Sequence, residues 1–233
     1  NFSSLYTYCH NSPVNLVDPT GCLASTHTDS IGNVVAVYND GDLGVYRHKA
    51  NAEETRKILA DEYSATNTSA GGERMGETLE WNSFVNSKSG KPIGEILFGS
   101  YLARDEIKRS INALNFKGIN PLYILSFYAV NARNGGIFDL KYGRTYTGSQ
   151  ISEGKYISMR DAGNFLAGCV AQKNGLFAED TYIAYGAFQL AGNDIFSMFA
   201  KFSLAKKLGA VGYYGEEPIS HVFQRRGYER NIK

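Results

Sequence analysis

Residues 155–168 read KYISMRDAGNFLAG, and this stretch predicts the helix around which the rest of the chain is organised. Ser158 is followed three residues later by Asp161, which is a capping-box pattern, so we expect the helix to begin directly after Ser158. Apolar residues then recur at helical spacing and predict one buried face. They are Ala162, Phe165, Leu166 and Cys169.

Two glycines and two polar residues distinguish this helix from an ordinary core helix. Gly163 and Gly168 each cost about 1 kcal/mol relative to alanine inside a helix, so we expect another backbone to approach closely there. Arg160 lies in the first turn, where free N–H groups and the macrodipole favour an anion, and Asn164 follows one turn later. The pattern predicts a phosphate-binding site at the amino end of the helix. The alternative is a solvated polar face.

The remaining patterns predict strands first and helices later. Residues 27–50 have the pattern of a β-hairpin around the turn signal at 39–42, and residues 137–142 alternate like a strand. Helical spacing and N-cap signals predict helices at 103–116, 121–130, 158–172, 179–191 and 193–208, and a last one from Pro218. Asn193 is the expected N-cap of the fifth helix. We therefore predict an α+β fold, with a small β-rich N-terminal connector before a mainly helical C-terminal domain.

The composition suits a folded chain, and its charge is unevenly distributed. The 233 residues, 43% of them apolar, are enough for one large or two small domains. Residues 1–100 carry 7 basic and 12 acidic residues, net −5, whereas residues 101–233 carry 17 and 11, net +6. The basic second part suits a polyanion such as nucleic acid. No run of 18 apolar residues occurs, so we expect no membrane span.

Several common site motifs do not occur in the sequence. The three cysteines, Cys9, Cys22 and Cys169, form no C-x-x-C pair and no disulfide framework. The chain also has no P-loop, no zinc-finger spacing and no G-x-S-x-G elbow. These observations argue against P-loop nucleotide hydrolysis, zinc-finger binding and Ser-His-Asp catalysis.

The first 22 residues resemble the end of an RHS/YD-repeat core. The boundary motif of that family is P-x-x-x-x-D-P-x-G, and Pro13, Asp18, Pro19 and Gly21 match it. The next residue here is Cys22, where the family usually has leucine. The resemblance implies a β-shell of repeats around a C-terminal toxin, with self-cleavage at the boundary.

The last part of the chain resembles the C-terminal domain of RHS-linked bacterial polymorphic toxins, and the closest class is polymorphic toxin type forty-four. The matching segments are 138–141 (FDLK), 155–168, 191–192 (AG) and 213–218 (YYGEEP). Related toxins often carry aspartate where this chain has Glu216. The resemblance divides the chain into the end of the RHS core (1–22), a connector (23–100) and a toxin domain (101–233).

The same resemblance implies a function and a set of partners. Toxins of this class are regarded as nucleases that hydrolyse RNA or DNA after delivery into competing bacteria. The expected protein is thus a secreted effector that acts in the target-cell cytoplasm. Its expected partners are the nucleic acid substrate, the RHS β-shell of the parent chain and a cognate immunity protein.

A carboxylate and a lysine in the predicted strand are the first catalytic candidates. Asp139 and Lys141 are two residues apart, so on a strand they would point to one face. Such a pair recurs in metal-dependent nucleases, where the carboxylate holds the ion and the lysine positions water. A divalent metal such as Mg²⁺ would then be held by Asp139 with Glu216 or Glu217, although the sequence leaves the need for a metal open. The alternative is a surface ion pair.

Further candidates come from the helical part. Arg160 would clamp a phosphate, with Lys155 and Arg225 adding positive charge for the substrate, and Asn164 would orient water or substrate. His221 is the only histidine beyond residue 100, so it is the candidate general acid or base of a metal-independent RNase. The alternative is a structural histidine.

Other function classes remain open at this point. One is a hydrolase or transferase that acts on cell-wall glycan or on a nucleotide cofactor, which a cleft with paired carboxylates would favour. Another is a non-enzymatic effector that binds a membrane or a protein. That function requires an exposed apolar helix, and residues 121–130 are the only segment that the sequence offers for it.

Overall fold

A computed structural model describes residues 23–114, 119–133 and 135–229, and it confirms the α+β fold class. The predicted RHS boundary at 1–22 lies outside the described residues. The described chain divides into two compact units. The first comprises residues 23–103 and 146–158, and the second comprises 104–145 and 159–229. The first unit thus takes in two strands that lie beyond the predicted boundary at residue 100.

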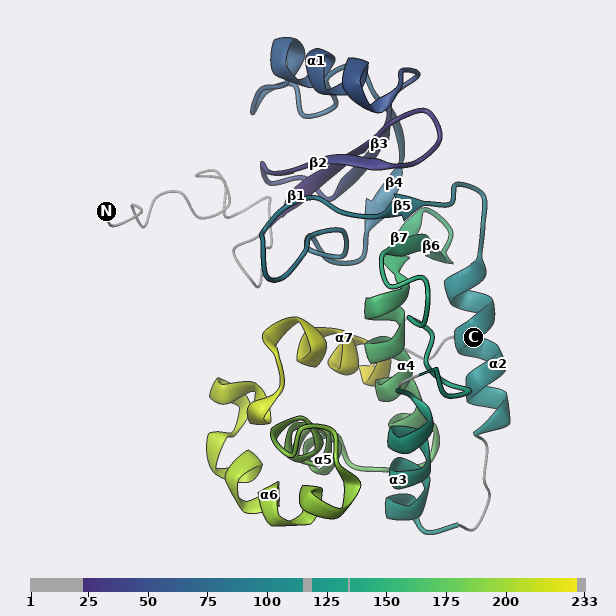
Figure 1. The fold of residues 1–233 in the computed structure, drawn as a ribbon, viewed down its shortest axis with the longest axis vertical. Coiled ribbons are helices and arrows are strands. Elements are labelled where there is room, and N and C mark those ends of the chain that lie inside the picture. The colour runs from purple at the N-terminus through teal and green to yellow at the C-terminus, as the bar shows by residue number, and fades with distance from the viewer. Residues whose placement is uncertain (1–22, 115–118, 134, 230–233) are drawn as a thin grey trace, which may run out of the picture. The chain divides into compact units, whose positions relative to one another are not determined.

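The first unit is built on one mixed β-sheet (Figure 1). Its strand order is β2-β1-β3-β4-β7-β6-β5. The strands are β1 (Ala24–Thr28), β2 (Val34–Asn39), β3 (Gly44–Arg47), β4 (Glu73–Thr78), β5 (Glu95–Ile96), β6 (Thr147–Ser152) and β7 (Lys155–Ser158). Neighbouring pairs alternate between antiparallel and parallel along the whole sheet, and residues far apart in sequence meet in it.

The hairpin predicted for residues 27–50 is wrong in its pairing. β2 and β3 flank the predicted turn, but they do not pair with each other. β1 lies between them, antiparallel to β2 and parallel to β3. The turn residues bond to β1 instead. Asp40 accepts hydrogen bonds from the backbone N–H and the hydroxyl of Ser25, and these bonds tie the turn to β1.

One helix covers part of this sheet. α1 (Ala52–Glu62) begins with a complete capping box, in which Asn51 accepts from the backbone of Glu54 and the Glu54 side chain accepts from the Asn51 N–H. The helix turns Leu59 toward β2, where it packs against Ala36. On most other sides α1 is exposed and charged.

A buried chain of hydrogen bonds links polar side chains of β1 to their neighbours. The hydroxyl of Ser25 donates to Asp40 at 2.5 Å, so its oxygen is free to accept from His27 Nε2 at 3.1 Å. His27 Nδ1 then accepts from His48 Nε2 at 3.1 Å. This order of donors requires the His27 imidazole to be neutral, because its Nδ1 atom acts as an acceptor. Burial lowers the pKa of His27 to about 3, with a further contribution from the charge of His48.

We expect the first unit to lose stability in mild acid because of this chain. The unfolded chain takes up a proton at His27 below about pH 6.5, whereas the folded chain does so only near pH 3. Stability should therefore fall by about 1.4 kcal/mol per pH unit within this window. Urea unfolding between pH 7 and pH 5, followed by the fluorescence of Trp81, which is the single tryptophan and lies in the first unit, measures this effect.

His27→Gln is the matched control, since it removes the titrating ring and keeps a side chain that can form hydrogen bonds. The pKa of Asp40 is raised by burial, and this acts with the opposite sign. Comparison of the two proteins isolates the histidine contribution. A wild-type protein whose unfolding is no more pH-dependent than that of His27→Gln would show that the ring is accessible to protons.

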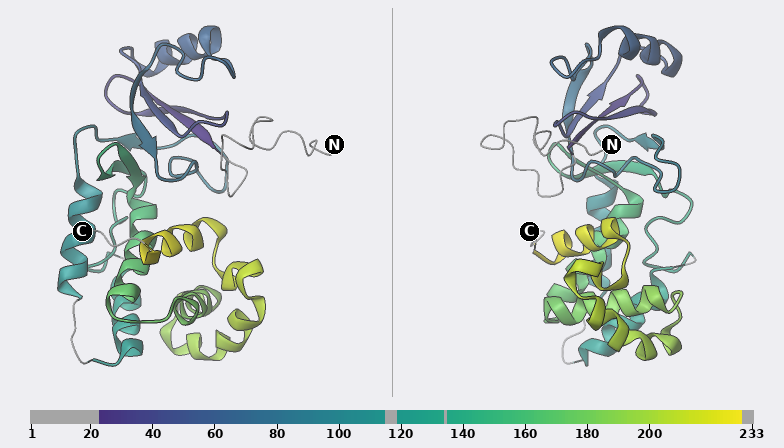
Figure 2. Two further views of the ribbon diagram at one scale, coloured as in Figure 1. Left: turned by 180° about the vertical axis from the view of Figure 1, so that it is seen from behind. Right: turned by 90° about the vertical axis from the view of Figure 1, so that its left-hand side faces the viewer.

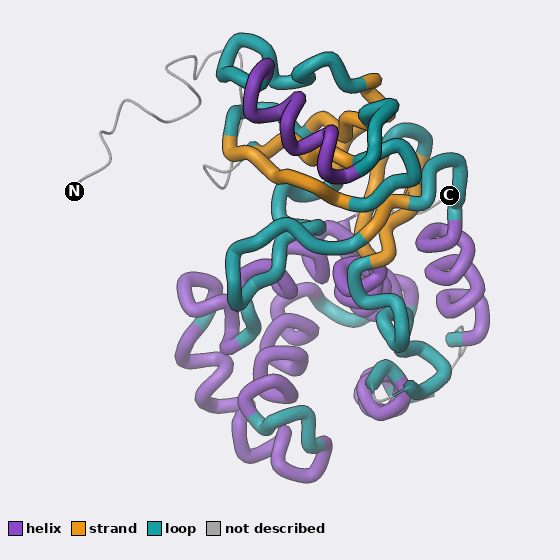
Figure 3. The backbone as a smooth tube through the Cα atoms, turned by 45° about the horizontal axis from the view of Figure 1, so that its top comes forward, coloured by secondary structure: helices purple, strands orange, loops and turns teal. Residues whose placement is uncertain are grey.

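The second unit consists of helices (Figure 3). They are α2 (Leu102–Ala113, whose first two residues belong to the first unit), α3 (Pro121–Asn131), α4 (Met159–Lys173), α5 (Ala178–Leu190), α6 (Ile195–Leu208), the 3₁₀ helix η2 (Ala210–Gly215) and α7 (Pro218–Glu229). α5 packs against α6 and η2, and α7 packs against α4 (Figure 2). A core of Tyr182, Ile183, Ala187, Met198, Ala205 and Tyr214 joins α5, α6 and η2.

α4 confirms most of the predictions made from residues 155–168. It begins at Met159, directly after Ser158, and Ala162, Phe165, Leu166 and Cys169 are all buried. Gly168 lies against α7, where an added Cβ would be 1.9 Å from the carbonyl oxygen of Gln224. Gly227 of α7 lies equally close to the Phe165 carbonyl oxygen. The predicted close backbone approach therefore exists at Gly168, and it is helix packing.

Two local predictions in this unit are wrong. Residues 137–142 form consecutive turns and no strand, because Asp139 N–H bonds to Gly136 O and Tyr142 N–H bonds to Asp139 O. α6 is capped by Asp194, whose carboxylate accepts from the backbone of Phe196 and Ser197. Asn193 instead takes a left-handed conformation, with φ of 63°. Within the described residues, no helix has the length and apolar character to cross a bilayer.

Candidate functional site

The segment before α7 has a strained backbone. Tyr213 and Tyr214 both have positive φ, 49° and 55°, which costs a non-glycine residue about 1–2 kcal/mol each. The conformation is held by the Tyr214 N–H bond to Gly209 O at 2.9 Å and by the close approach of Tyr214 O to Gly186. Strain of this kind persists where the surrounding packing enforces it, and here it fixes the position of Glu216 two residues later.

His221 is enclosed by three tyrosine rings in the first turn of α7. Its ring lies 4.8 Å from that of Tyr182 and 5.8 Å from those of Tyr213 and Tyr214. Burial, and secondarily the charge of Arg225, lowers the pKa of His221, so the ring is neutral at pH 7. Its Nδ1 atom is buried and has no hydrogen-bond partner among the described residues.

Glu216 has the properties of a group that exchanges protons near neutral pH. It is half-buried, and its Oε1 accepts a hydrogen bond from Gln224 Nε2 at 3.2 Å. Burial raises the pKa of Glu216 to about 7, and the neighbouring Glu217 adds to this rise. The Gln224 hydrogen bond and the charge of Lys141 act in the opposite direction. A carboxyl tuned in this way is half-ionised at neutral pH, which favours a general acid or base.

Three further predicted residues influence Glu216, neighbour it in sequence or contact the start of α7. Lys141 is exposed in the turns that precede β6, and its charge acts on Glu216. Asn164 of α4 donates to the Ser220 hydroxyl of α7 at 3.2 Å, so α4 contributes a polar group beside the start of α7. Glu217 is adjacent to Glu216 in sequence and is exposed. The structure thus brings part of the predicted set together within the second unit.

Arg160 is largely buried in an ion pair. Its Nε and Nη2 atoms donate to the two oxygens of Asp161, at 2.7 Å and 3.0 Å, and its side chain is 16% exposed. Its backbone N–H bonds to Thr145 O. Removal of the guanidinium would take a charged partner away from Asp161, which is fully buried. Loss of activity in Arg160→Ala would therefore report on folding as readily as on phosphate binding.

The other two predicted substrate-binding cations form ion pairs of their own. Lys155 belongs to β7 of the first unit and pairs with Glu77 of β4. Arg225 is exposed on α7 and lies 3.7 Å from Glu229, one turn further along. The Arg225–Glu229 pair is exposed and the Lys155–Glu77 pair is partly exposed, and exposed pairs contribute little to stability.

The predicted metal ligands do not converge in this structure. Within the part of the chain that is described, no three His, Cys, Asp or Glu side chains form a group that could hold a metal ion. Asp139 is in a turn, where its Oδ2 accepts from the Gly135 N–H at 3.0 Å. The fit of Asp139, Glu216 and Glu217 to a divalent ion is therefore poor.

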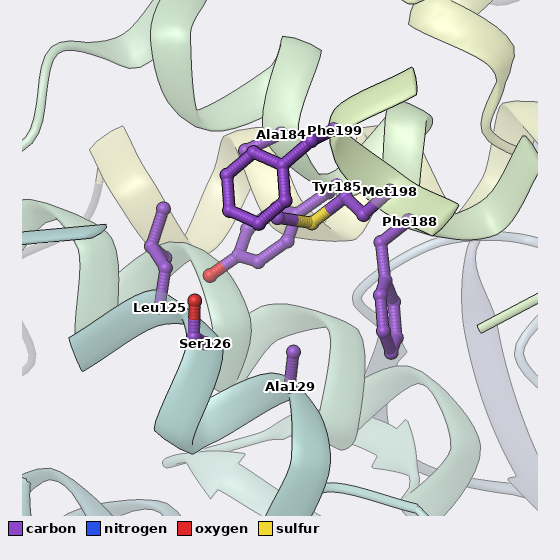
Figure 4. Close-up of a pocket in the computed structure, with 8 residues that line it drawn as sticks. All are labelled: Leu125, Ser126, Ala129, Ala184, Tyr185, Phe188, Met198 and Phe199. Atoms are coloured by element: carbon purple, nitrogen blue, oxygen red, sulfur yellow. The ribbon is translucent and has the colours of Figure 1, made fainter. Parts of the chain in front are cut away.

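The second unit also has a small apolar cavity between α3, α5 and α6 (Figure 4). Its volume is about 10 Å³, which is close to the minimum that one water molecule needs. The lining residues are Leu125, Ser126, Ala129, Ala184, Tyr185, Phe188, Met198 and Phe199. A cavity this small and apolar does not serve as a substrate site.

Gln224 and Ser220 are site residues that were not predicted. They are four residues apart on α7, hence on one face, and helical spacing from Pro218 could have indicated this. Their partners, Glu216 and Asn164, come from outside the helix. The contact between Asn164 and Ser220 joins residues 56 positions apart, and no local pattern signals it.

Comparisons with protein-family models, curated proteins and solved structures find no match for this chain.

Proposed function

We propose that the protein is an antibacterial toxin effector whose second unit hydrolyses phosphodiester bonds of nucleic acid. The observation that carries the proposal is Glu216, a half-buried carboxyl with a pKa of about 7, under the influence of the Lys141 charge. Phosphodiester cleavage needs a base for the nucleophile and a cation for the phosphate. The net charge of +6 on residues 101–233 supports a polyanionic substrate.

In the proposed reaction Glu216 acts as the general base. Its ionised carboxylate takes the proton from the attacking hydroxyl, which is a ribose 2′-OH or a water molecule. The new oxygen–phosphorus bond forms as the bond to the leaving oxygen breaks, and solvent water protonates that oxygen. Lys141 offsets the charge that grows on the phosphate, and the amide of Gln224 keeps the carboxylate in position.

His221 has a positioning role in this proposal. Its ring is neutral at pH 7 and 9% exposed, so it is poorly placed to exchange protons with a substrate. Its contacts with Tyr213 and Tyr214 support the strained segment that carries Glu216. Arg160 remains a candidate phosphate clamp, but Lys141 is the better one because its side chain is exposed.

The wider biology of the proposal rests on the toxin resemblance. An RHS β-shell of the parent chain would enclose the effector before its release, and a cognate immunity protein would neutralise it. The site of action would be the cytoplasm of the target cell. A basic effector and an acidic inhibitor would associate quickly through electrostatic steering.

The full chain should cleave single-stranded RNA or plasmid DNA in vitro. Each substrate is incubated with the protein in Mg²⁺ and, separately, in chelator, because this separates the metal question from the substrate question. Nucleic acid that stays intact in every arm, while the same preparation remains toxic inside cells, would overturn the nuclease proposal and favour another target.

Lys141→Gln should lower kcat/KM for cleavage by about tenfold to a hundredfold, since it removes a cation beside the reacting phosphate. The loss should be largest at low salt, where charges are least screened. Lys173→Gln is the control, because Lys173 is also an exposed lysine but lies in the last turn of α4. Equal rates for both variants would exclude Lys141 from the site.

A further inference from the structure

α6 and η2 expose several apolar side chains. Met198 and Ala205 of α6 are buried in the core with α5, whereas five other apolar side chains of α6 and η2 are exposed. We call the exposed set the α6 outer face. It consists of Phe196 (87% exposed), Phe199 (60%), Leu204 (42%), Leu208 (40%) and, from η2, Val211 (96%).

An apolar surface of this kind is unusual on a chain that stands alone in water. A helix that is apolar on both sides is normally covered on both. Contiguous exposed apolar side chains usually mark a binding surface. Two of the five side chains of the α6 outer face are almost fully solvated, so their exposure is not a consequence of loose packing.

The charge of the segment indicates what covers it. Residues 195–215 contain Lys201, Lys206 and Lys207 and no Asp or Glu, which gives a net charge of +3. An occupant should therefore be anionic as well as apolar. A second copy of the chain would bring six lysines together, so charge complementarity disfavours self-association.

The exposed side chains and the small size of the adjoining cavity favour a lipid over a peptide. Phe196 and Val211 are almost fully exposed, and the cavity between α3, α5 and α6, which Phe199 also lines, has a volume of only about 10 Å³. Exposed Phe and Leu together with Lys are the pattern of helices that lie in the interface of a bilayer. We propose that the α6 outer face binds the surface of an anionic phospholipid bilayer.

This binding places the helix in the interfacial plane. α6 has 14 residues, whereas a helix that crosses the hydrocarbon core needs about 20. The apolar side chains would enter the boundary between headgroups and acyl chains, and the lysines would contact the phosphates. The inference does not depend on the proposed nuclease function, because none of these side chains belongs to the site around Glu216.

The test is co-sedimentation of the full chain with two kinds of vesicle. Phosphatidylcholine vesicles that contain a third of phosphatidylglycerol should bind the protein at least about tenfold more tightly than pure phosphatidylcholine vesicles. High salt should weaken the binding. Absence of sedimentation with either vesicle, or equal binding to both, would overturn the proposal and leave an acidic protein as the occupant to test.

Two variants locate the surface. Phe196→Ser/Val211→Ser removes the two most exposed side chains and should lower vesicle affinity about tenfold or more while thermal stability stays unchanged. Ile31→Ser is the matched control, because Ile31 is 79% exposed in the first unit and should have no effect. Vesicle binding that survives the double substitution would place the lipid contact elsewhere. Nucleic-acid cleavage by each variant is measured in parallel, so failure of one proposal is distinguishable from failure of the other.

Discussion

Glu216→Gln should abolish nucleic-acid cleavage and, above pH 7, make the second unit harder to unfold. Glutamine keeps the acceptor oxygen for Gln224 but cannot take a proton, so we expect kcat to fall by about a hundredfold to ten-thousandfold. The wild-type rate should rise with pH through about 7 as Glu216 ionises. This rise should be missing from any residual activity of the variant.

The gain in stability follows from the raised pKa. The folded chain binds the Glu216 proton up to about pH 7, whereas the unfolded chain releases it near pH 4.5. The carboxyl therefore favours folding below pH 4.5, and this contribution is lost as pH rises to 7. Glutamine stays neutral, so the variant should be more stable by about 3 kcal/mol at pH 8 and no more stable than wild type below pH 4.5.

Urea unfolding followed by helical circular dichroism measures this difference, and Glu217→Gln is its control. Glu217 is adjacent but exposed, so its substitution should leave stability nearly unchanged. If both carboxylates held a metal, both variants would lose activity together with any dependence on Mg²⁺. An inactive variant that is also more stable cannot be explained by misfolding. Full activity in Glu216→Gln would remove Glu216 from the mechanism.

Helix ends are the features that the sequence predicts best, because they depend on residues within one turn. α3 begins at Pro121, α4 follows Ser158 directly, and α7 begins at Pro218, each at the signal that indicates it. The burial of Ala162, Phe165, Leu166 and Cys169 in α4 likewise follows from their helical spacing. These are local effects, and tertiary contacts reinforce them.

The incorrect predictions concern segments in which two local rules compete or in which pairing is non-local. Residues 137–142 alternate like a strand, but Gly135 and Gly143 take positive φ at either end, and short-range turn bonds replace a ladder. β2 and β3 flank a good turn signal, yet β1 pairs with both. Whether two strands that follow each other in sequence pair directly or on either side of a third strand depends on the whole sheet. No short stretch of sequence therefore predicts the pairing.

The chemistry of the candidate site was the least predictable part. The sequence motif indicates Glu216 as a metal ligand, whereas its raised pKa arises from burial. Glu216 follows the strained Tyr213–Tyr214 backbone, which packs against Gly186, a residue far away in the chain. Sequence patterns identify a carboxylate; the surrounding fold decides whether it is ionised at neutral pH.

Gly168→Ala should destabilise the second unit by about 3 kcal/mol or more, because α4 and α7 touch through their backbones there. The new Cβ would lie 1.9 Å from Gln224 O and 2.6 Å from Tyr228 N, and both atoms belong to the backbone of α7. A backbone cannot rotate away as a side chain does, so the helices must separate. Because Gln224 also bonds to Glu216, activity should fall with stability.

Gly163→Ala adds the same methyl group to the same helix and should have the opposite effect. Within the described residues, nothing lies within 4 Å of the position that its Cβ would take. Alanine should therefore stabilise α4 by about 0.5–1 kcal/mol through its higher helix propensity. Denaturant midpoints of the two variants, followed by helical circular dichroism, give the comparison. If both variants lost stability equally, the cost would come from α4 itself, and the glycine contact with α7 would not explain why Gly168 is glycine.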